Sequence, residues 1–178
     1  ICKKEKYKNL VAYAAINKFL NQNKILAPKL YSFDYKNGIM EIEDFGDISF
    51  YKVLLKTKNR FLIYKEIVDL LIKVQKINPK KKIKVFKNVS YKIGRYTKKN
   101  LFKESDLFFD WYLPQFLSKK KVSKIKKNAN KVLYKLYNRL NFSNSNFVHR
   151  DFHVQNLIKV GKKVGVIDSQ DALIGSPA

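Results

Sequence analysis

The residues best suited to chemistry lie near the C-terminal end of the sequence, where the pattern H-R-D-x-x-x-x-N runs from His149 to Asn156. A short apolar hairpin pattern follows and leads to Asp168. An aspartate, an asparagine and a second aspartate in this order are typical of loops that transfer a phosphoryl group from ATP. That reaction depends on an oriented hydroxyl group and on cations that neutralise the phosphate oxygens. The spacing therefore predicts a phosphotransferase site with ATP and Mg²⁺ as cofactors.

Three side chains divide the work in this interpretation. Asp151 is the predicted catalytic base, because a carboxylate can accept the proton of the acceptor hydroxyl as the new O–P bond forms. Asn156 and Asp168 are the predicted Mg²⁺ ligands, since this hard cation prefers oxygen and takes few protein carboxylates beside phosphates and water. His149 is expected to tie the loop to neighbouring backbone. For His153, a hydrogen bond to the substrate and packing of the loop are equally good interpretations.

Hydrophobic periodicity predicts the elements that must position this loop. Apolar residues at helical spacing predict a helix over residues 7–23. Short apolar runs at 30–33 and 39–42 flank Asn37-Gly38, which predicts a β-hairpin with a tight turn. Further predicted elements are helices over residues 50–55, 63–77, 101–117 and 122–140, and a second hairpin formed by 157–160 and 164–167. The lysine-rich segment 80–96 is expected to be a surface connection, and the mixture of elements predicts an α+β fold.

The composition predicts a globular protein in spite of its charge. The chain has 178 residues with 46% hydrophobic and 14% aromatic content, which excludes a disordered polymer. Its 38 basic and 14 acidic residues give a net charge of +24, which raises the question of nucleic acid or anionic membranes as partners. Only four of the basic residues are arginine, the side chain on which recognition of base edges depends most. We therefore attribute the charge to the compositional bias of an AT-rich genome and expect no specific nucleic-acid partner.

Membrane and redox features are sparse. No apolar run approaches the length of a membrane span and no cationic, apolar leader is present, so we expect a soluble, cytoplasmic protein without a membrane partner. The single cysteine, Cys2, allows no internal disulfide, which agrees with a reducing compartment. Neither it nor the two histidines have the spacing of a zinc site.

Four sequence blocks resemble the aminoglycoside phosphotransferase and choline kinase superfamily, and within it the bacterial amino-sugar kinases. Residues 148–157 read V-H-R-D-F-H-V-Q-N-L and residues 165–172 read G-V-I-D-S-Q-D-A, similar to the catalytic loop and metal-binding segment of that group. The E-I-E-D-F-G-D block at 41–47 resembles its hinge, and L-F-F-D-W-Y-L-P at 107–114 resembles its helix near the sugar pocket. A protein kinase would have Lys in place of His153 and D-F-G from position 168, so both departures favour a small-molecule kinase.

The resemblance implies a protein-kinase-like fold, with a partial small lobe and hinge over residues 1–46 and a mainly helical, truncated large lobe over 47–178. It implies that the backbone of Glu41, Ile42 and Glu43 contacts adenine. The implied reaction is transfer of the γ-phosphate of ATP to a hydroxyl of N-acetylmuramate or N-acetylglucosamine in cell-wall recycling. An aminoglycoside, choline or homoserine is the alternative acceptor.

Three further residues are candidates to shape the acceptor site. Asp171 could instead cap a following helix, and these two roles are evenly balanced. Asp110 and Trp111 lie in the block that resembles the helix near the sugar pocket. A tryptophan on a helix is more often part of a core than a ligand platform, so core packing is favoured for Trp111.

The superfamily places a glycine-rich turn and a phosphate-binding lysine before its first helix, where this sequence has only residues 1–6, including Lys3 and Lys4. Because the sequence also starts with Ile1 rather than Met, we expect an internal fragment that is weakly active or inactive alone. Two other functions stay open. One is a lysine-rich module that binds nucleic acid or anionic lipid, and the other is a pseudokinase, against which the intact Asp151, Asn156 and Asp168 argue.

Overall fold

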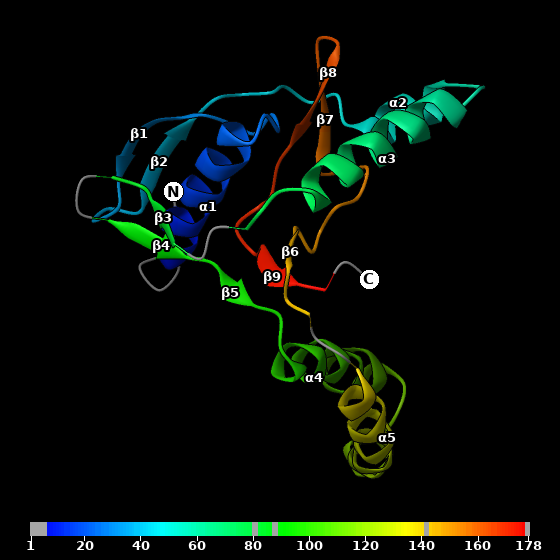
Figure 1. The fold of residues 1–178 in the computed structure, drawn as a ribbon. Coiled ribbons are helices and arrows are strands. Elements are labelled where there is room, and N and C mark those ends of the chain that lie inside the picture. Colours follow the sequence, from blue (N-terminus) through cyan, green and yellow to red (C-terminus); the bar gives the residue numbers. More distant parts are fainter. Residues whose placement is uncertain (1–6, 80–81, 87–88, 141–142, 177–178) are drawn as a thin grey trace. The chain divides into compact units, whose positions relative to one another are not determined.

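The computed structural model describes residues 7–79, 82–86, 89–140 and 143–176, which form helices and short strands (Figure 1). Tertiary contacts divide the chain into two compact units. The larger unit comprises residues 1–94 and 145–178, and the smaller unit comprises residues 95–144. The α+β class expected from the sequence is confirmed. The protein-kinase-like fold and the lobe boundary after residue 46 stay predictions.

Helix α1 (Tyr7–Gln22) supplies the centre of the core of the larger unit. Its completely buried side chains lie on one helical face and are Ala15, Ile16, Phe19 and Leu20. The helix ends in a Schellman arrangement, in which the Ile25 N–H donates to the Leu20 carbonyl (3.0 Å) and Lys24 adopts a φ of 62°. This left-handed residue turns the chain away from the helix axis, close to the predicted end.

Strands β1 (Leu30–Asp34) and β2 (Ile39–Ile42) form the expected antiparallel hairpin. The connecting turn is longer than the two-residue type that Asn37-Gly38 suggests, because residues 35–38 all belong to it and only Gly38 has a positive φ (70°). The Asp34 carboxylate accepts a hydrogen bond from the Asn37 N–H (3.1 Å) and stabilises this longer turn.

Helices α2 (Phe50–Lys56) and α3 (Phe61–Gln75) follow where the periodicity predicts them. Helix α2 begins after Ser49, whose hydroxyl accepts a hydrogen bond from the Lys52 N–H (3.4 Å). The buried residues of α3 are Ile67, Leu70 and Val74, at helical spacing. A capping residue therefore accounts for the start of α2, and the predicted apolar periodicity accounts for the buried face of α3.

The lysine-rich segment 80–96 is not a surface connection in the part that the structure describes, so that prediction is wrong. It contains strands β3 (Lys82–Lys84) and β4 (Ser90–Lys92), which pair antiparallel. Ile83, Val85 and Ile93 are buried in the core. These apolar residues are separated by lysines and other polar side chains, which hid the alternation of a strand. Residues 80, 81, 87 and 88 lie outside the described ranges.

The remaining strands of the larger unit are β6 (Asn146–Val148), β7 (Leu157–Val160), β8 (Lys163–Val166) and β9 (Leu173–Gly175). Strands β7 and β8 form the predicted second hairpin, with Gly161 at a φ of 59°. Strand β6 pairs antiparallel with β9, a three-residue strand that no sequence pattern predicted. Phe147 of β6 packs against Phe19 of α1, with ring centroids 5.7 Å apart. The chain therefore enters the loop after β6 directly from the core.

Strand β5 (Gly94–Arg95) marks the boundary between the two units. The helical segments of the smaller unit are α4 (Lys98–Leu107), the π-helical turn η2 (Phe108–Tyr112), the 3₁₀ turn η3 (Leu113–Gln115) and α5 (Lys119–Arg139). Phe109 and Val122 are buried, whereas Val132 on the apolar stripe of α5 is 58% exposed. Trp111 is 75% exposed, so the expectation that it packs in a core is wrong for this chain.

Among the described helices, none combines the length and the apolar character needed to cross a membrane.

Candidate active site

The loop between β6 and β7 is closed by hydrogen bonds among its own residues. The His153 N–H donates to the Asp151 carbonyl (3.0 Å), and the Asn156 N–H donates to the His153 carbonyl (2.9 Å). The side-chain amide of Asn156 also donates to the Asp151 carbonyl (3.0 Å). These bonds use the backbone of Asp151 and leave its side chain exposed to solvent. The backbone of the predicted base is therefore held by hydrogen bonds, and its carboxylate is accessible to solvent.

His149 fixes this loop to the following hairpin, as the sequence predicts. Its Nε2 lies 3.1 Å from the carbonyl oxygen of Ile167, and only 4% of the residue is exposed. The Nδ1 atom is buried without a hydrogen-bond partner among the described residues. Burial lowers the pKa of His149 below its ordinary value, while the bond to Ile167 and the charges of Asp151 and Asp168 act in the opposite direction. The imidazole is therefore neutral near pH 7, with its proton on Nε2.

Asp168 follows β8 in a left-handed conformation with a φ of 61°. Its Oδ1 accepts a hydrogen bond from the side-chain amide of Gln170 (2.7 Å), and its Oδ2 lies 3.5 Å from Nδ2 of Asn156. The two predicted metal ligands are thus neighbours, although 12 positions separate them in the sequence. No described residue donates a hydrogen bond to Oδ1 of Asn156, and Asp168 is exposed. Both side chains offer oxygen atoms of the kind that Mg²⁺ prefers.

A cleft of about 560 Å³ opens beside this pair within the larger unit. Helix α1 contributes Asn9, Leu10 and Tyr13 to one wall. The remaining lining residues come from the β1–β2 region, the segment after β2 and the catalytic hairpin: Pro28, Met40, Ile42, Glu43, Asp44, Phe45, Gly46, Asn156, Ile158, Ile167, Asp168 and Gln170. The cleft therefore joins the segment that resembles a hinge to the predicted metal ligands.

The segment that resembles a hinge lines the cleft with residues 42–46. Ile42 and Glu43 line the cleft as expected, but Glu41 does not, and its carboxylate instead accepts a hydrogen bond from the Ser32 hydroxyl (2.9 Å). The Glu43 N–H donates to the Lys29 carbonyl (2.8 Å), which extends the hairpin pairing beyond β2. Asp44, Phe45 and Gly46 also line the cleft, where the chain leaves the hairpin. They belong to the block that resembles a hinge but were not among the residues expected to contact adenine. Gly46 allows the chain to turn there, with a φ of 73°.

Phe45 is placed by close packing on Gly165 of β8. A Cβ atom at Gly165 would lie 2.5 Å from the nearest carbon of the Phe45 ring. Only a glycine leaves room for the ring at this position. The identity of residue 165 therefore determines where one side chain of the cleft wall lies.

The candidates for the acceptor site divide between the two units. In the larger unit, His153 is exposed and its Nε2 lies 3.3 Å from Nδ2 of Asn156, a contact within the loop. Asp171 precedes strand β9 rather than a helix, so its predicted alternative role as a helix cap is wrong. Its carbonyl accepts a hydrogen bond from the Arg150 guanidinium (3.5 Å). Roles of His153 and Asp171 in binding an acceptor stay predictions.

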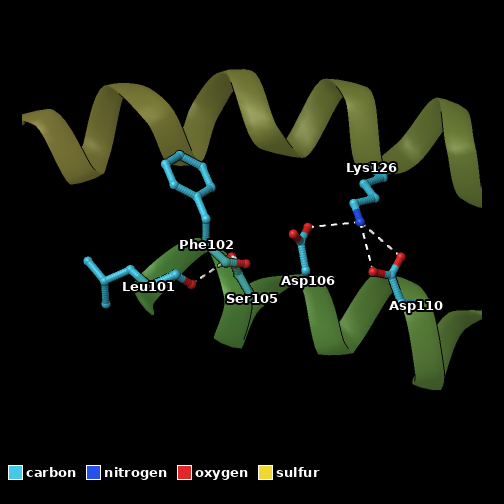
Figure 2. A network of polar contacts seen from close by, with 6 residues as sticks. All are labelled: Leu101, Phe102, Ser105, Asp106, Asp110 and Lys126. Atoms are coloured by element: carbon cyan, nitrogen blue, oxygen red, sulfur yellow. Dashed lines mark hydrogen bonds and ion pairs between the residues drawn. The ribbon is translucent and has the colours of Figure 1, made fainter. Parts of the chain in front are cut away.

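Asp110 of the smaller unit takes part in an ion-pair network. Figure 2 shows Lys126 of α5 reaching both Asp106 of α4 and Asp110 of η2, at 2.9 Å from each carboxylate. The hydrogen bond to Asp110, followed in importance by the one to Asp106, raises the pKa of Lys126 above its ordinary value. Asp110 is therefore already paired with a cation, and its predicted acceptor role, like that of the exposed Trp111, stays a prediction.

Within the described ranges, no three or more His, Cys, Asp or Glu side chains form a group that could hold a metal ion. A cation beside Asp168 would therefore need oxygen ligands from Asn156, water and the phosphates of a nucleotide, as is usual for Mg²⁺ in phosphotransferases.

No family model matches the chain. Curated proteins that are similar to it include N-acetylmuramate/N-acetylglucosamine kinases of Caulobacter vibrioides (24% identical over 172 residues), Pseudomonas aeruginosa (28% over 148) and Neisseria meningitidis serogroup B (23% over 171). The matches cover 94%, 83% and 94% of this chain, and 47%, 40% and 47% of the respective relatives. The chain thus spans less than half the length of these curated relatives.

Proposed function

We propose that the full-length protein is an ATP-dependent kinase that phosphorylates a hydroxyl group of a small molecule, most favourably an amino sugar. The observation that carries the proposal is the cleft whose walls include residues 42–46 on one side and Asn156 and Asp168 on the other. Its volume of about 560 Å³ is in the range of small-molecule and cofactor sites. The similarity to three curated kinases supports the same type of reaction.

The segment after β2 supports the proposal of nucleotide binding. The backbone N–H groups of Asp44 and Phe45 donate to no described residue, whereas the Glu43 N–H is already paired with Lys29. The N–H groups of Asp44 and Phe45 are therefore better placed than the backbone of Glu41 to bond the edge of adenine. Ile42, Phe45 and Leu10 supply apolar surface for the base.

The phosphate end of the nucleotide would lie beside Asn156 and Asp168. The Asp168 carboxylate and Oδ1 of Asn156 would hold Mg²⁺, which neutralises phosphate charge when it is bound. The exposed Asp151 carboxylate would orient the acceptor hydroxyl and accept its proton while the O–P bond forms. His149 holds the loop through its bond to Ile167 and is not proposed as the base, because the ring nitrogen that could accept a proton, Nδ1, is buried.

The proposed acceptor is N-acetylmuramate or N-acetylglucosamine, the sugars in the names of the three relatives. Choline, homoserine and aminoglycosides are the alternative acceptors. The proposed location is the cytoplasm, where ATP is available.

An ATP-consumption screen of the full-length protein tests this function. The acceptors are N-acetylmuramate, N-acetylglucosamine, choline and kanamycin, each with and without Mg²⁺. We expect Mg²⁺-dependent turnover with an amino sugar and a loss of about 10²-fold or more in Asp151→Asn, the typical contribution of a general base. Asp69→Asn is the matched control, since Asp69 is an exposed carboxylate that pairs with Lys65 on α3, away from the cleft lining.

Two results would contradict the proposal. Activity that survives Asp151→Asn would remove the base assignment. Salt-sensitive binding to DNA with low-micromolar or tighter affinity, together with no binding of Mg-ATP, would instead support the lysine-rich binding module.

A further inference from the structure

Two buried polar side chains connect helix α1 to the turn that follows Asp168. The Ser169 hydroxyl donates a 2.6 Å hydrogen bond to Oδ1 of Asn17. Asn17 is 3% exposed and Ser169 is completely buried. Burying polar groups is unfavourable unless each is bonded, and these two residues lie 152 positions apart. The pair is therefore a specific tertiary connection between the helix and the turn.

The Asn17 amide is bonded on both sides. Its Nδ2 donates to the carbonyl oxygen of Pro28 (3.2 Å), an atom that can only accept. The opposite amide orientation would place two acceptors face to face at Pro28, so Oδ1 must face the Ser169 hydroxyl. An aspartate could not replace Asn17, because it would place a buried carboxylate against the Pro28 carbonyl.

Asp168 lies between two anchored neighbours. On one side, the Ile167 N–H donates to the Asn156 carbonyl (3.0 Å). On the other side, Ser169 is held by Asn17. The φ of 61° at Asp168 is sparsely populated by residues other than glycine, and such a conformation persists when the surroundings hold it. Asn17 supplies the anchor on the C-terminal side.

Tyr13 brings the same helix face to the cleft. It lines the cleft one helical turn before Asn17. Burial raises the pKa of the Tyr13 phenol above its ordinary value, a hydrogen bond with Asn17 lowers it, and the charge of Asp168 adds to the rise. The phenol therefore stays uncharged at neutral pH, and α1 presents no second negative charge to Asp168 at this point.

We infer that Asn17 is a positioning residue for the proposed phosphoryl transfer, because through Ser169 it holds the Asp168 carboxylate in the orientation that binds a divalent cation. This inference rests on the proposed function. It concerns a residue that does not itself reach the nucleotide or the cation.

The test compares Asn17→Leu, Ser169→Ala and the double variant in the full-length protein. The first readout is the affinity of the ADP complex for Mn²⁺, measured by electron paramagnetic resonance, and the second is kcat and the KM of the acceptor. We expect each single variant to weaken Mn²⁺ binding and to lower kcat by about tenfold, the usual effect of losing a group that orients a metal ligand. The acceptor KM should not change, since no acceptor contact is lost.

The double variant distinguishes a shared connection from two independent losses. Because both substitutions remove the same hydrogen bond, the double variant should bind Mn²⁺ no more weakly than the single variant with the lower affinity. Asn21→Leu is the matched control, since Asn21 lies one turn further along α1 and its Nδ2 donates to the local Ala27 carbonyl (2.7 Å). It should lower the melting temperature without changing Mn²⁺ affinity.

Wild-type Mn²⁺ affinity in both single variants would overturn the inference while leaving the proposed function intact. An unmodified protein that neither binds Mn²⁺ with ADP nor consumes ATP would overturn the proposed function and this inference with it. Ser169→Ala removes a single hydroxyl, so it decides the question if Asn17→Leu does not fold.

Discussion

The imidazole Nε2 of His149 lies 3.1 Å from the carbonyl oxygen of Ile167, so one buried side chain joins the loop of the predicted base to the residue that precedes Asp168. The bond needs a proton on Nε2 and none on Nδ1, because Nδ1 is buried without a partner among the described residues. A second proton on the ring would bury both a charge and an unsatisfied donor. The geometry of the site is therefore linked to the neutral state of one histidine.

Stability should consequently depend on pH through His149. Burial lowers its pKa in the folded protein below the ordinary value of 6.5 that applies to the unfolded chain. The unfolded state thus binds more protons between these two values, so the stabilisation is complete above 6.5 and is lost as the pH falls toward the lowered pKa. One such group changes the free energy of unfolding by at most about 1.4 kcal/mol per pH unit. Urea denaturation of the full-length protein between pH 5.5 and 8 measures this slope.

Two variants separate the effect of His149 from that of His153, the second histidine of this sequence. His149→Gln should reduce the pH dependence of the urea midpoint in this window, and His153→Gln, at an exposed position, should leave it unchanged. An unchanged slope in His149→Gln would assign the effect to other groups and contradict the prediction.

The left-handed φ of 61° at Asp168 predicts a conflict between stability and activity. Asp168→Gly and Asp168→Ala both remove the carboxylate, and each should abolish Mg²⁺-dependent turnover. Glycine adopts this φ without strain, whereas alanine does not, so the glycine variant should unfold with a free energy about 1 kcal/mol higher than the alanine variant. Denaturant titration of both variants measures the difference. Equal stabilities would show that the conformation relaxes once the carboxylate is gone.

The sequence predicts well those helices and strands whose formation is determined by residues within the segment itself. Helix α1 and the β7–β8 hairpin show their periodicity and their end signals within the segment itself, and both form as predicted. The lysine-rich segment 80–96 does not, because the burial of Ile83 and Ile93 comes from packing against distant parts of the chain. Strand β9 was not predicted either, since a three-residue strand depends on pairing with strands from elsewhere in the chain, such as β6.

The candidate site follows the same rule. The order of Asp151, Asn156 and Asp168 is a local pattern, and the structure brings the last two within 3.5 Å of each other. Which residues of the 41–47 block line the cleft could not be predicted, because the bond from the Glu43 N–H to the Lys29 carbonyl joins two segments that the sequence does not relate. The connection between Asn17 and Ser169 is likewise a product of the tertiary fold alone.

The close contact between Gly165 and Phe45 predicts a linked effect on stability and nucleotide binding. A methyl group at position 165 would overlap the Phe45 ring at 2.5 Å, so Gly165→Ala must displace a side chain that lines the cleft. We expect a loss of about 1–3 kcal/mol in unfolding free energy, as is typical of overpacking, and weaker ATP binding by calorimetry. Adding Phe45→Leu to Gly165→Ala should recover part of the stability. If the double variant is less stable than Gly165→Ala, the overlap is not the cause.

The ion-pair network of the smaller unit predicts a specific role for one lysine among many. Lys126 lies between Asp106 and Asp110, which are four residues apart on consecutive helical segments, and its side chain is 28% exposed. Lys126→Met leaves two like charges facing each other, so the free energy of unfolding should fall by about 0.5–1 kcal/mol at low salt. Denaturant titration measures the change, which should shrink as salt screens the two carboxylates.

Lys127→Met is the matched control, because Lys127 is the next residue on α5 and is exposed. It removes the same charge from a chain with a net charge of +24, so general charge repulsion would make both variants equally or more stable than the unmodified protein. Only the pairing in Figure 2 predicts a loss confined to Lys126→Met. Adding Asp106→Asn to Lys126→Met removes one of the two charges that the lysine neutralises. If this second substitution restores the stability, the loss in Lys126→Met is due to repulsion between the two aspartates.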